Sequence, residues 1–506
     1  MKRARPFSAA LALGPLLFAG CTVGPNYSRP DVATPAAWKE SPPAATAPSA
    51  PQTGAWWEIF GDTELAALEA QVIASNQDLQ RAAARIAAAR ALARVSEADL
   101  YPNLSAGVSN SRFRTSANRA PASPAVEASD HAAQFDLSYE LDFWGRVRRV
   151  SEAARAEAAV AVDDYHVAQL TLTADAARDY FQLRSLDAEH AILEATLALR
   201  RDEVRLQETR NQAGLINEVD VTRARTEAAN VEAELHAIAR DRARTEHALA
   251  ILCGKSPAEF SVAARAATTG LPAVPAGLPS SLLQRRPDLA AAEHELHAAC
   301  ARIGVAKADF LPRVSLTGSA GFASAELSSL TASDSRAWSI GPSVHLPLFD
   351  GGRNRANLAA AQANYDAALA AYRGAALTAF REVEDALSDH RTLALQAEAV
   401  QRALASARDT AALANERYQR GLSNYLDVVD AQRAVLQTER LDRRLQLELT
   451  LSAVQLTKAL GGGWSANRMK TNAASSGHSP EVQPMVLDTA SSGLALDRRN
   501  LRPASS

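Results

Sequence analysis

A sequence unit from the first half of the chain returns in the second half, about 210 residues later. The matching stretches pair residues 75–79 with 285–289, residues 143–146 with 349–353, and residues 210–214 with 417–421. Solenoid repeats are much shorter, so the pattern indicates one large unit duplicated in tandem. Both copies are expected to contain a short helix, then two strands, then very long helices. The first unit is assigned to residues 61–277 and the second to residues 278–463.

The N-terminus, residues 1–20, reads as a signal peptide rather than as part of the fold. Lys2, Arg3 and Arg5 precede an apolar stretch that is too short to span a bilayer, and small residues lead up to Cys21. This order resembles a bacterial lipoprotein cleavage site, with Phe18 where leucine is more usual. Cys21 is therefore expected to become the lipidated N-terminus of an outer-membrane protein. An ordinary secretory signal, cleaved after a small residue, is the alternative.

Composition limits the functions that fit this chain. Its 506 residues have a formal net charge of −3, which argues against nucleic acid as a partner. After the signal only Cys253 and Cys300 remain, so neither a disulfide framework nor a cysteine-based metal site is expected. The sequence has no Gly-rich phosphate loop and no nucleophile elbow, and its helical histidines are scattered. We therefore expect no enzyme activity, no metal and no cofactor.

Each unit contains two stretches in which apolar and polar residues alternate, the pattern of a strand with two different faces. They lie at about residues 103–115, 131–143, 313–325 and 336–348. In the second stretch, for example, Phe135, Leu137 and Tyr139 alternate with Asp136 and Ser138. Strands of about 10 to 12 residues can cross a bilayer when tilted, so four transmembrane strands are expected. A half-buried soluble sheet would show the same alternation.

Long stretches almost free of proline and glycine follow each pair of strands and predict very long helices. The longest would measure about 100 Å at 1.5 Å per residue, and the second of them carries apolar residues every seven positions, as in coiled coils. Gly214 and Gly421 suit left-handed C-terminal caps, and Asn217 and Asn424 suit N-caps of returning helices. The expected helices are residues 145–212, 217–252, 353–420 and 424–460.

Three further segments complete the expected organisation. Residues 21–60 are rich in proline and alanine and predict an extended tether, which Trp56 and Trp57 would anchor. One helix is expected from about residue 63 to about residue 100, where Pro102 ends it. The tail, residues 464–506, is expected to be disordered.

Four membrane-length strands cannot close a barrel, because the smallest known transmembrane barrels need about eight. An open edge in lipid would leave costly unpaired backbone amides. Identical copies must therefore complete the wall, with about eight strands from two copies or about twelve from three. The helices of all copies would continue as a hollow tube about 100 Å long, which is a conduit from the outer membrane into the periplasm.

Several motifs together carry a family resemblance. They are residues 21–27, 56–60, 141–146, 278–288, 347–353 and 425–433. The chain resembles the TolC-like outer-membrane efflux family, in its OprM/NodT lipoprotein branch, over about residues 15–463. The resemblance implies an α+β membrane protein in which four transmembrane strands per protomer complete a twelve-stranded trimeric β-barrel. A long periplasmic α-helical barrel of coiled-coil hairpins would continue it.

The same resemblance implies a function in the outer membrane of a Gram-negative bacterium. The trimer would be the exit duct of a tripartite pump, working with a periplasmic adaptor protein and an inner-membrane RND-type transporter. It would passively conduct small toxic compounds or drugs to the exterior. A duct for type I protein secretion is one alternative, and a coiled-coil structural lipoprotein without a pore is another.

Gate residues are implied at the tip of the second hairpin. Leu426, Asp430 and Arg433 match constriction positions of the OprM branch, and Asp427 matches an acidic ring position of the TolC branch. Asp427 and Asp430 lie three residues apart and share a helix face. Threefold symmetry would bring six carboxylates around one opening, which would favour cations. Acids that merely complement the helix dipole are the alternative.

Supporting roles are implied for residues around this gate. Asp220 and Arg223 are expected to form ion pairs across hairpins, and Tyr418 matches a tyrosine of the TolC-branch lock. Adaptor docking is expected at the hairpin tips, by analogy with the family. The tip residues are Gly214, Asn217, Gly421 and Asn424.

Overall fold

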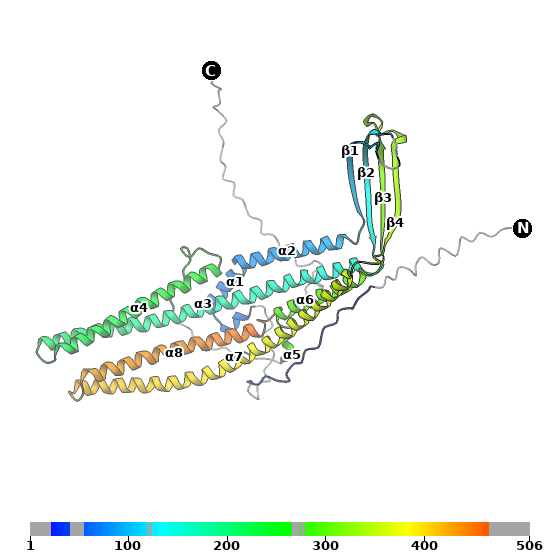
Figure 1. Cartoon of the computed structure of the whole chain (residues 1–506). Helices are drawn as coiled ribbons and strands as arrows, with labels where there is room; N and C mark the ends of the chain where they lie inside the picture. The colour runs from blue at the N-terminus through cyan, green and yellow to red at the C-terminus, as the bar shows by residue number, and fades with distance from the viewer. Residues whose placement is uncertain are drawn as a thin grey trace, which may run out of the picture. The chain divides into compact units, whose positions relative to one another are not determined.

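The computed structural model describes residues 22–40, 55–118, 121, 124–265, 274 and 279–464. The signal peptide, Cys21 and nearly all of the tail lie outside the described residues. Long helices and one small sheet make up the fold (Figure 1). None of the described helices is apolar enough over a sufficient length to cross a bilayer.

The two repeat units contain corresponding elements. The first unit consists of α1 (Thr63–Ser75), α2 (Gln77–Ala98), β1 (Asn103–Arg114), β2 (Glu127–Leu141), α3 (Arg146–Gln212) and α4 (Glu218–Leu252). The second consists of α5 (Pro279–Leu282), α6 (Pro287–Ala308), β3 (Arg313–Ser324), β4 (Arg336–His345), α7 (Arg353–Gln419) and α8 (Tyr425–Ala459). Helices α3 and α4 form one antiparallel hairpin, hairpin one, and α7 and α8 form hairpin two.

The four strands form one antiparallel sheet in the order β1-β2-β3-β4. Its register aligns apolar side chains of all strands on one face, as in the row Ala106, Phe135, Ala320 and Trp338. The neighbouring row, on the other face, is Ser105, Asp136, Ser319 and Ser339. The apolar face is uncovered within the chain, since Phe135 is 59% exposed and Trp338 is 76% exposed. The sheet thus has one apolar face and one polar face, and both faces are exposed.

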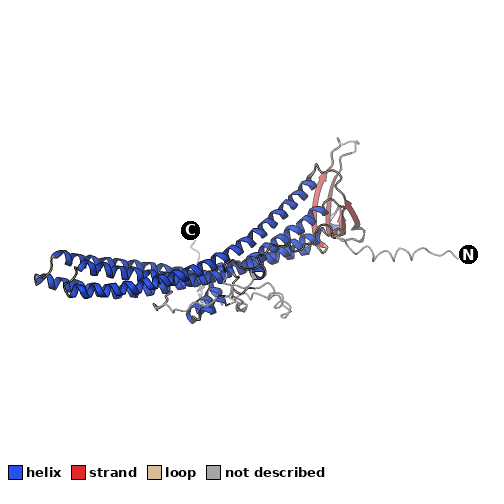
Figure 2. Ribbon diagram, turned by 90° about the horizontal axis from the view of Figure 1, so that it is seen from below, coloured by secondary structure: helices blue, strands red, loops and turns tan. Residues whose placement is uncertain are grey.

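The helices follow the order of the strands. Next to the sheet, α2 packs on α3, α3 on α6, and α6 on α7, which repeats the order β1-β2-β3-β4. Farther from the sheet, α4 replaces α2 beside α3, and α8 replaces α6 between α3 and α7 (Figure 1). Figure 2 shows these helices side by side, with the strands at one end. One chain therefore supplies a single layer of four helices at every level, with free edges on α2 and α4 and on α7.

Asn76 divides the helix that was expected to be continuous from residue 63 to residue 100. Its backbone is extended (φ −65°, ψ 128°), so α1 ends at Ser75 and α2 begins at Gln77. The Asn76 side chain accepts hydrogen bonds from the backbone N–H groups of Asp78 and Leu79, and its amide donates to the Leu252 carbonyl at 2.9 Å. The expectation failed because a buried N-cap, tied to the end of α4, outweighs the helix propensity around it.

Replacing Asn76 by alanine should lower the free energy of unfolding by about 2 kcal/mol, because the cap is lost and the partly buried Leu252 carbonyl loses its donor. Chemical unfolding in detergent measures this. The matched control is Asn217→Ala, which removes a solvent-exposed cap on α4 and should have a smaller effect. Equal effects of the two substitutions would contradict the role of the Leu252 contact.

Residues 22–40 of the predicted tether contain no helix or strand, but they are more than a tether, while residues 41–54 lie outside the described residues. Tyr27 stacks on His297 of α6 with ring centroids 4.5 Å apart, and Arg29 pairs with Glu293 at 3.1 Å. Farther along, Trp38 is buried against α7 and the backbone N–H groups of residues 39 and 40 donate to Glu384. The segment is therefore held along one face of α6 and α7.

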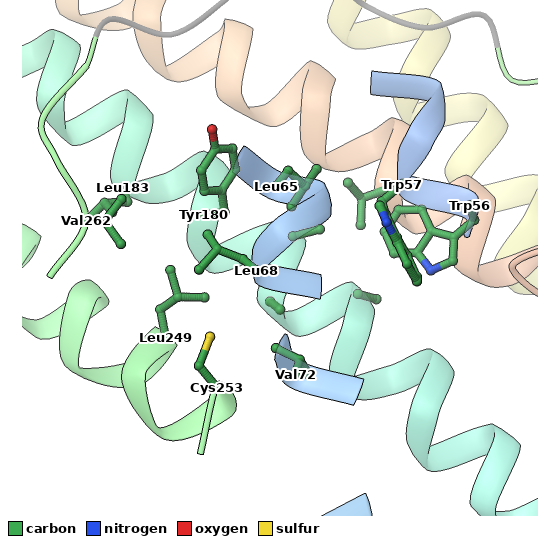
Figure 3. Packing of buried hydrophobic residues seen from close by; sticks show 14 residues of the cluster. Trp56, Trp57, Leu65, Leu68, Val72, Tyr180, Leu183, Leu249, Cys253 and Val262 are labelled. Atoms are coloured by element: carbon green, nitrogen blue, oxygen red, sulfur yellow. The ribbon is translucent and has the colours of Figure 1, made fainter. Parts of the chain in front are cut away.

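A hydrophobic core lies where α1 meets α3 and α4 (Figure 3). Trp56 and Trp57, in the short 3-10 helix η2 (Trp56–Phe60), are buried in it, which confirms that they anchor the N-terminal segment. Tyr180 and Leu183 of α3 are fully buried there. Glu69 of α1 is also fully buried, and neither of its carboxylate oxygens has a hydrogen-bond partner in the described chain. The core thus contains a carboxyl group, that of Glu69, for which the described part of the chain supplies no hydrogen-bond partner.

Candidate functional site at the hairpin tips

Both hairpins turn with the same capping geometry. After α3 the N–H of Leu215 donates to the carbonyl of Arg210, and after α7 the N–H of Leu422 donates to the carbonyl of Arg417, which are Schellman motifs. Gly214 and Gly421 adopt the left-handed conformation these motifs need, with φ of 72° and 75°. The side chains of Asn217 and Asn424 then accept from the N–H groups of Asp220 and Asp427, so all four predicted caps are confirmed.

The start of α8 is fixed by buried side chains on one face, so that its acids point the other way. Tyr425, Val428 and Val429 are buried in a cluster with Ala224 of α4. Asp427 and Asp430 are exposed, and Leu426, which precedes them, is partly exposed. Three apart on the helix, the two carboxylates share one surface. The structure therefore places Leu426, Asp427 and Asp430 together on the exposed surface of α8 at the hairpin tip.

Arg433 connects the two hairpins. Its guanidinium donates to both carboxylate oxygens of Glu227 on α4, including 2.9 Å from Nε to Oε2, and lies 3.3 Å from Asp430. Glu227 is only 7% exposed, whereas Arg433 is 48% exposed. The hydrogen bonds to Glu227 raise the pKa of Arg433 above its usual value. A cavity of about 340 Å³ opens beside this pair, lined by Glu218, Val219, Thr222, Arg223, Thr226, Glu227 and Arg433.

Tyr418 connects α7 to α3. The Arg210 guanidinium donates to the Tyr418 hydroxyl at 2.9 Å and lies over its ring at 5.3 Å from the centroid. The Tyr418 hydroxyl donates to Gln207, and its ring contacts Tyr425 with centroids 5.7 Å apart. A cation over a tyrosine face adds to the hydrogen bond, so this contact holds the end of hairpin two on hairpin one.

Ion pairs of Asp220 and Arg223 across the hairpins of neighbouring copies stay a prediction. Within one copy the two residues pair with each other at 3.7 Å in α4, and among the described residues they form no ion pair with hairpin two. Their spacing of three residues on one helix explains this, because each is the nearest partner of the other. The bridging role belongs to Glu227, which sequence reasoning missed. The available signal was a carboxylate on the buried side of α4, among Val221, Ala224, Val231 and Ile238.

Comparisons with known proteins agree with this architecture. The sequence profile of the outer membrane efflux protein family matches residues 68–255 and 278–462. The solvent efflux pump outer membrane protein SrpC of Pseudomonas putida is 35% identical over 471 residues, covering 92% of this chain and 98% of SrpC. Outer membrane protein OprJ of Pseudomonas aeruginosa is also 35% identical, over 467 residues that cover 91% of this chain and 97% of OprJ.

Solved structures are similar over nearly the same length. The outer-membrane channel OprN matches with a TM-score of 0.80 and 34% identity, covering 88% of this chain and 100% of OprN. The CmeC outer membrane channel of Campylobacter jejuni matches with a TM-score of 0.84 and 25% identity, covering 90% of this chain and 98% of CmeC. This chain therefore belongs to the outer membrane efflux protein family and is a channel protein of the Gram-negative outer membrane.

Proposed function

We propose that three copies of this chain form the exit duct of a tripartite efflux pump. The observation that carries the proposal is the four-stranded sheet, whose edge strands β1 and β4 have no strand neighbour among the described residues. In a bilayer each unpaired backbone group costs several kcal/mol, so the edges need partners. The β4 edge of one copy and the β1 edge of the next supply them, and three copies close about twelve strands.

The two faces of the sheet support an assignment of outside and inside. The exposed apolar row around Trp338 suits lipid acyl chains, and the row of Ser105, Asp136 and Ser319 suits a watery interior. Wider barrels of this kind enclose an aqueous channel rather than a packed core. The alternation along every strand thus provides the lining and the lipid contact at once.

The helical layer supports the same assignment, because it is hollowed on one face. A cavity of about 490 Å³ is lined by residues of α2, α3, α6 and α7 together, many of them alanines. On α6 the cavity is lined by Ala299, Arg302 and Ala306. The N-terminal segment contacts the opposite side of α6, at Glu293 and His297. We assign the hollowed face to the lumen and the covered face to the outside of the tube.

Partners follow from the two ends of this tube. The exposed tips at Gly214, Asn217, Gly421 and Asn424 are proposed to dock a periplasmic adaptor, which joins the duct to an inner-membrane RND-type transporter. Residue 23 donates its N–H to the Trp144 carbonyl at 2.9 Å, at the elbow between sheet and helix. A lipid on Cys21 would thus enter the membrane beside the base of the sheet. The cargo is proposed to be small toxic compounds, in line with solvent and toluene efflux relatives.

Leu426, Asp427 and Asp430 are proposed to form the constriction, with Arg433, Asp220, Arg223 and Tyr418 supporting it. Six exposed carboxylates around a narrow opening attract cations and repel anions. The double variant Asp427→Asn and Asp430→Asn should therefore lower the cation-to-anion permeability ratio severalfold. Reversal potentials of single channels in a salt gradient measure it. Asp409→Asn, on α7 away from the tip, is the control, and a double variant with wild-type selectivity would rule out the acidic ring.

A further inference from the structure

A second cross-link between the hairpins lies deeper than the Arg433–Glu227 pair. Arg440 of α8 donates to Glu189 of α3 and, at 2.7 Å, to Glu234 of α4. Arg433 and Arg440 are seven residues apart, and so are their α4 partners Glu227 and Glu234. Seven residues are about two helical turns, or about 10 Å along the axis. The two sets of contacts therefore follow one another along the parallel helices α4 and α8. We call the Arg433–Glu227 pair the tip rung, and we call Arg440 with Glu189 and Glu234 the deep rung.

The rungs differ in their surroundings. Arg440 is 20% exposed and Glu189 is 7% exposed, while Arg433, at the tip, is 48% exposed and borders the 340 Å³ cavity. Beside Arg440, Leu436 packs onto an apolar cluster of hairpin one. That cluster contains Leu186, Leu193, Leu197, Val231 and Ile238. The deep rung thus joins three helices next to apolar packing, and the tip rung joins two helices next to open space.

Close helix packing adds to this contrast. Among the described helices α3 packs against α8 along part of its length, whereas α4 and α8 are not a closely packed pair. At the tip the half-exposed Arg433 joins α8 to α4 beside the small buried cluster of Tyr425, Val428 and Val429, and contacts of exposed charged side chains cost little to break. At Arg440, separation would break contacts with two helices at once, to Glu189 of α3 and to Glu234 of α4, and would leave the Glu189 carboxylate with Arg444 at 3.9 Å. The deep rung is thus the harder one to break.

We propose that Arg440 is a positioning residue: it forms the pivot about which hairpin two swings when the tip opens. When the tip opens, the Arg433–Glu227 contact breaks. The contacts of Arg440 with Glu189 and Glu234 stay formed, and they determine the final position of α8. The inference depends on the proposed gate, because it adds the fixed point to a moving tip. Glu189 and Glu234 together hold the guanidinium from two helices, which fixes a direction as well as a distance.

Single-channel recording of the reconstituted protein tests the pivot. In the closed state, Arg440→Met should show several unequal current levels instead of one, because α8 has lost its fixed point. The mean leak current should rise roughly tenfold. Arg408→Met is the matched control, because Arg408 pairs with Glu439 inside hairpin two, one residue from Arg440. Its recordings should match wild type. Glu234→Gln, which leaves Arg440 on Glu189, should give a smaller leak and serves if Arg440→Met does not fold.

Crosslinking distinguishes a pivot, which stays formed when the channel opens, from a contact that must break before the channel can open. In an Arg433→Ala channel, Arg440→Cys and Glu234→Cys joined by a flexible bis-maleimide should leave the conductance high. In an otherwise wild-type channel, Arg433→Cys and Glu227→Cys joined by the same reagent should hold the channel closed. A closed channel with the deep crosslink, or wild-type recordings for Arg440→Met and Glu234→Gln, would overturn the pivot. If Arg433→Ala itself fails to raise conductance, the gate is wrong rather than the pivot.

Discussion

Arg433→Ala is expected to raise the ion conductance of the reconstituted channel roughly tenfold. The substitution leaves the carboxylate of Glu227, which is 7% exposed, without the guanidinium that binds both its oxygens. A buried carboxylate that loses its partner is strongly disfavoured, and it regains water when the hairpins separate. A shift of about 1.4 kcal/mol toward separation corresponds to the tenfold change. Planar bilayer recordings at neutral pH provide the measurement.

A control near the same tip tests whether the position of the ion pair matters. Arg225 pairs with Glu208 at 2.7 Å, but both residues belong to hairpin one. Arg225→Ala should therefore leave the conductance at the wild-type level. Adding Glu227→Gln to Arg433→Ala should bring the conductance back toward the wild-type level, because glutamine removes the buried carboxylate that Arg433→Ala leaves unpaired. An additive increase would show that Arg433 and Glu227 act separately, contrary to the gate contact.

Local patterns in the sequence were sufficient to predict most of the elements. Alternation places β1, β3 and β4 near their observed positions, although β2 begins at Glu127 rather than near residue 131. Glycine and asparagine at fixed offsets predict the caps of both hairpins, because a left-handed residue and a short polar acceptor are needed within a few residues of each other. These features depend on neighbours in the chain, so the sequence carries them directly.

Contacts between distant segments were not predictable in the same way. Arg433 and Glu227 are about two hundred residues apart, and nothing in the spacing of either helix indicates which arginine meets which acid. Tyr27 likewise finds its partner on α6, so a proline-rich segment that reads as a tether is fixed along the helices. Such pairings depend on how helices pack, and a single sequence indicates only that a charged residue lies on a buried face.

Glu69→Leu is expected to change the free energy of unfolding in the stabilising direction, and this effect should be about 3 kcal/mol larger at pH 7.5 than at pH 5. Burial without any hydrogen bond raises the pKa of Glu69 from 4.5 to about 9. Between these values the unfolded chain releases the proton and the folded chain keeps it. Stability is therefore fully present below pH 4.5 and falls by about 1.4 kcal/mol per pH unit as the pH rises toward 9. Leucine removes the titrating group and fills a similar volume.

Chemical unfolding in detergent at pH 5, 6.5 and 8 measures this dependence. Wild type should lose stability across the series, while Glu69→Leu and Glu69→Gln should both lose much less, since neither can ionise. At pH 8 both variants should be more stable than wild type, and Glu69→Leu should be the more stable of the two, because glutamine leaves an unpaired amide in the core. Glu58→Leu, an exposed acid on the neighbouring η2, should retain the wild-type slope. A wild-type protein equally stable at pH 5 and pH 8 would contradict the prediction, because it would show that the pKa of Glu69 is the same in the folded and the unfolded chain.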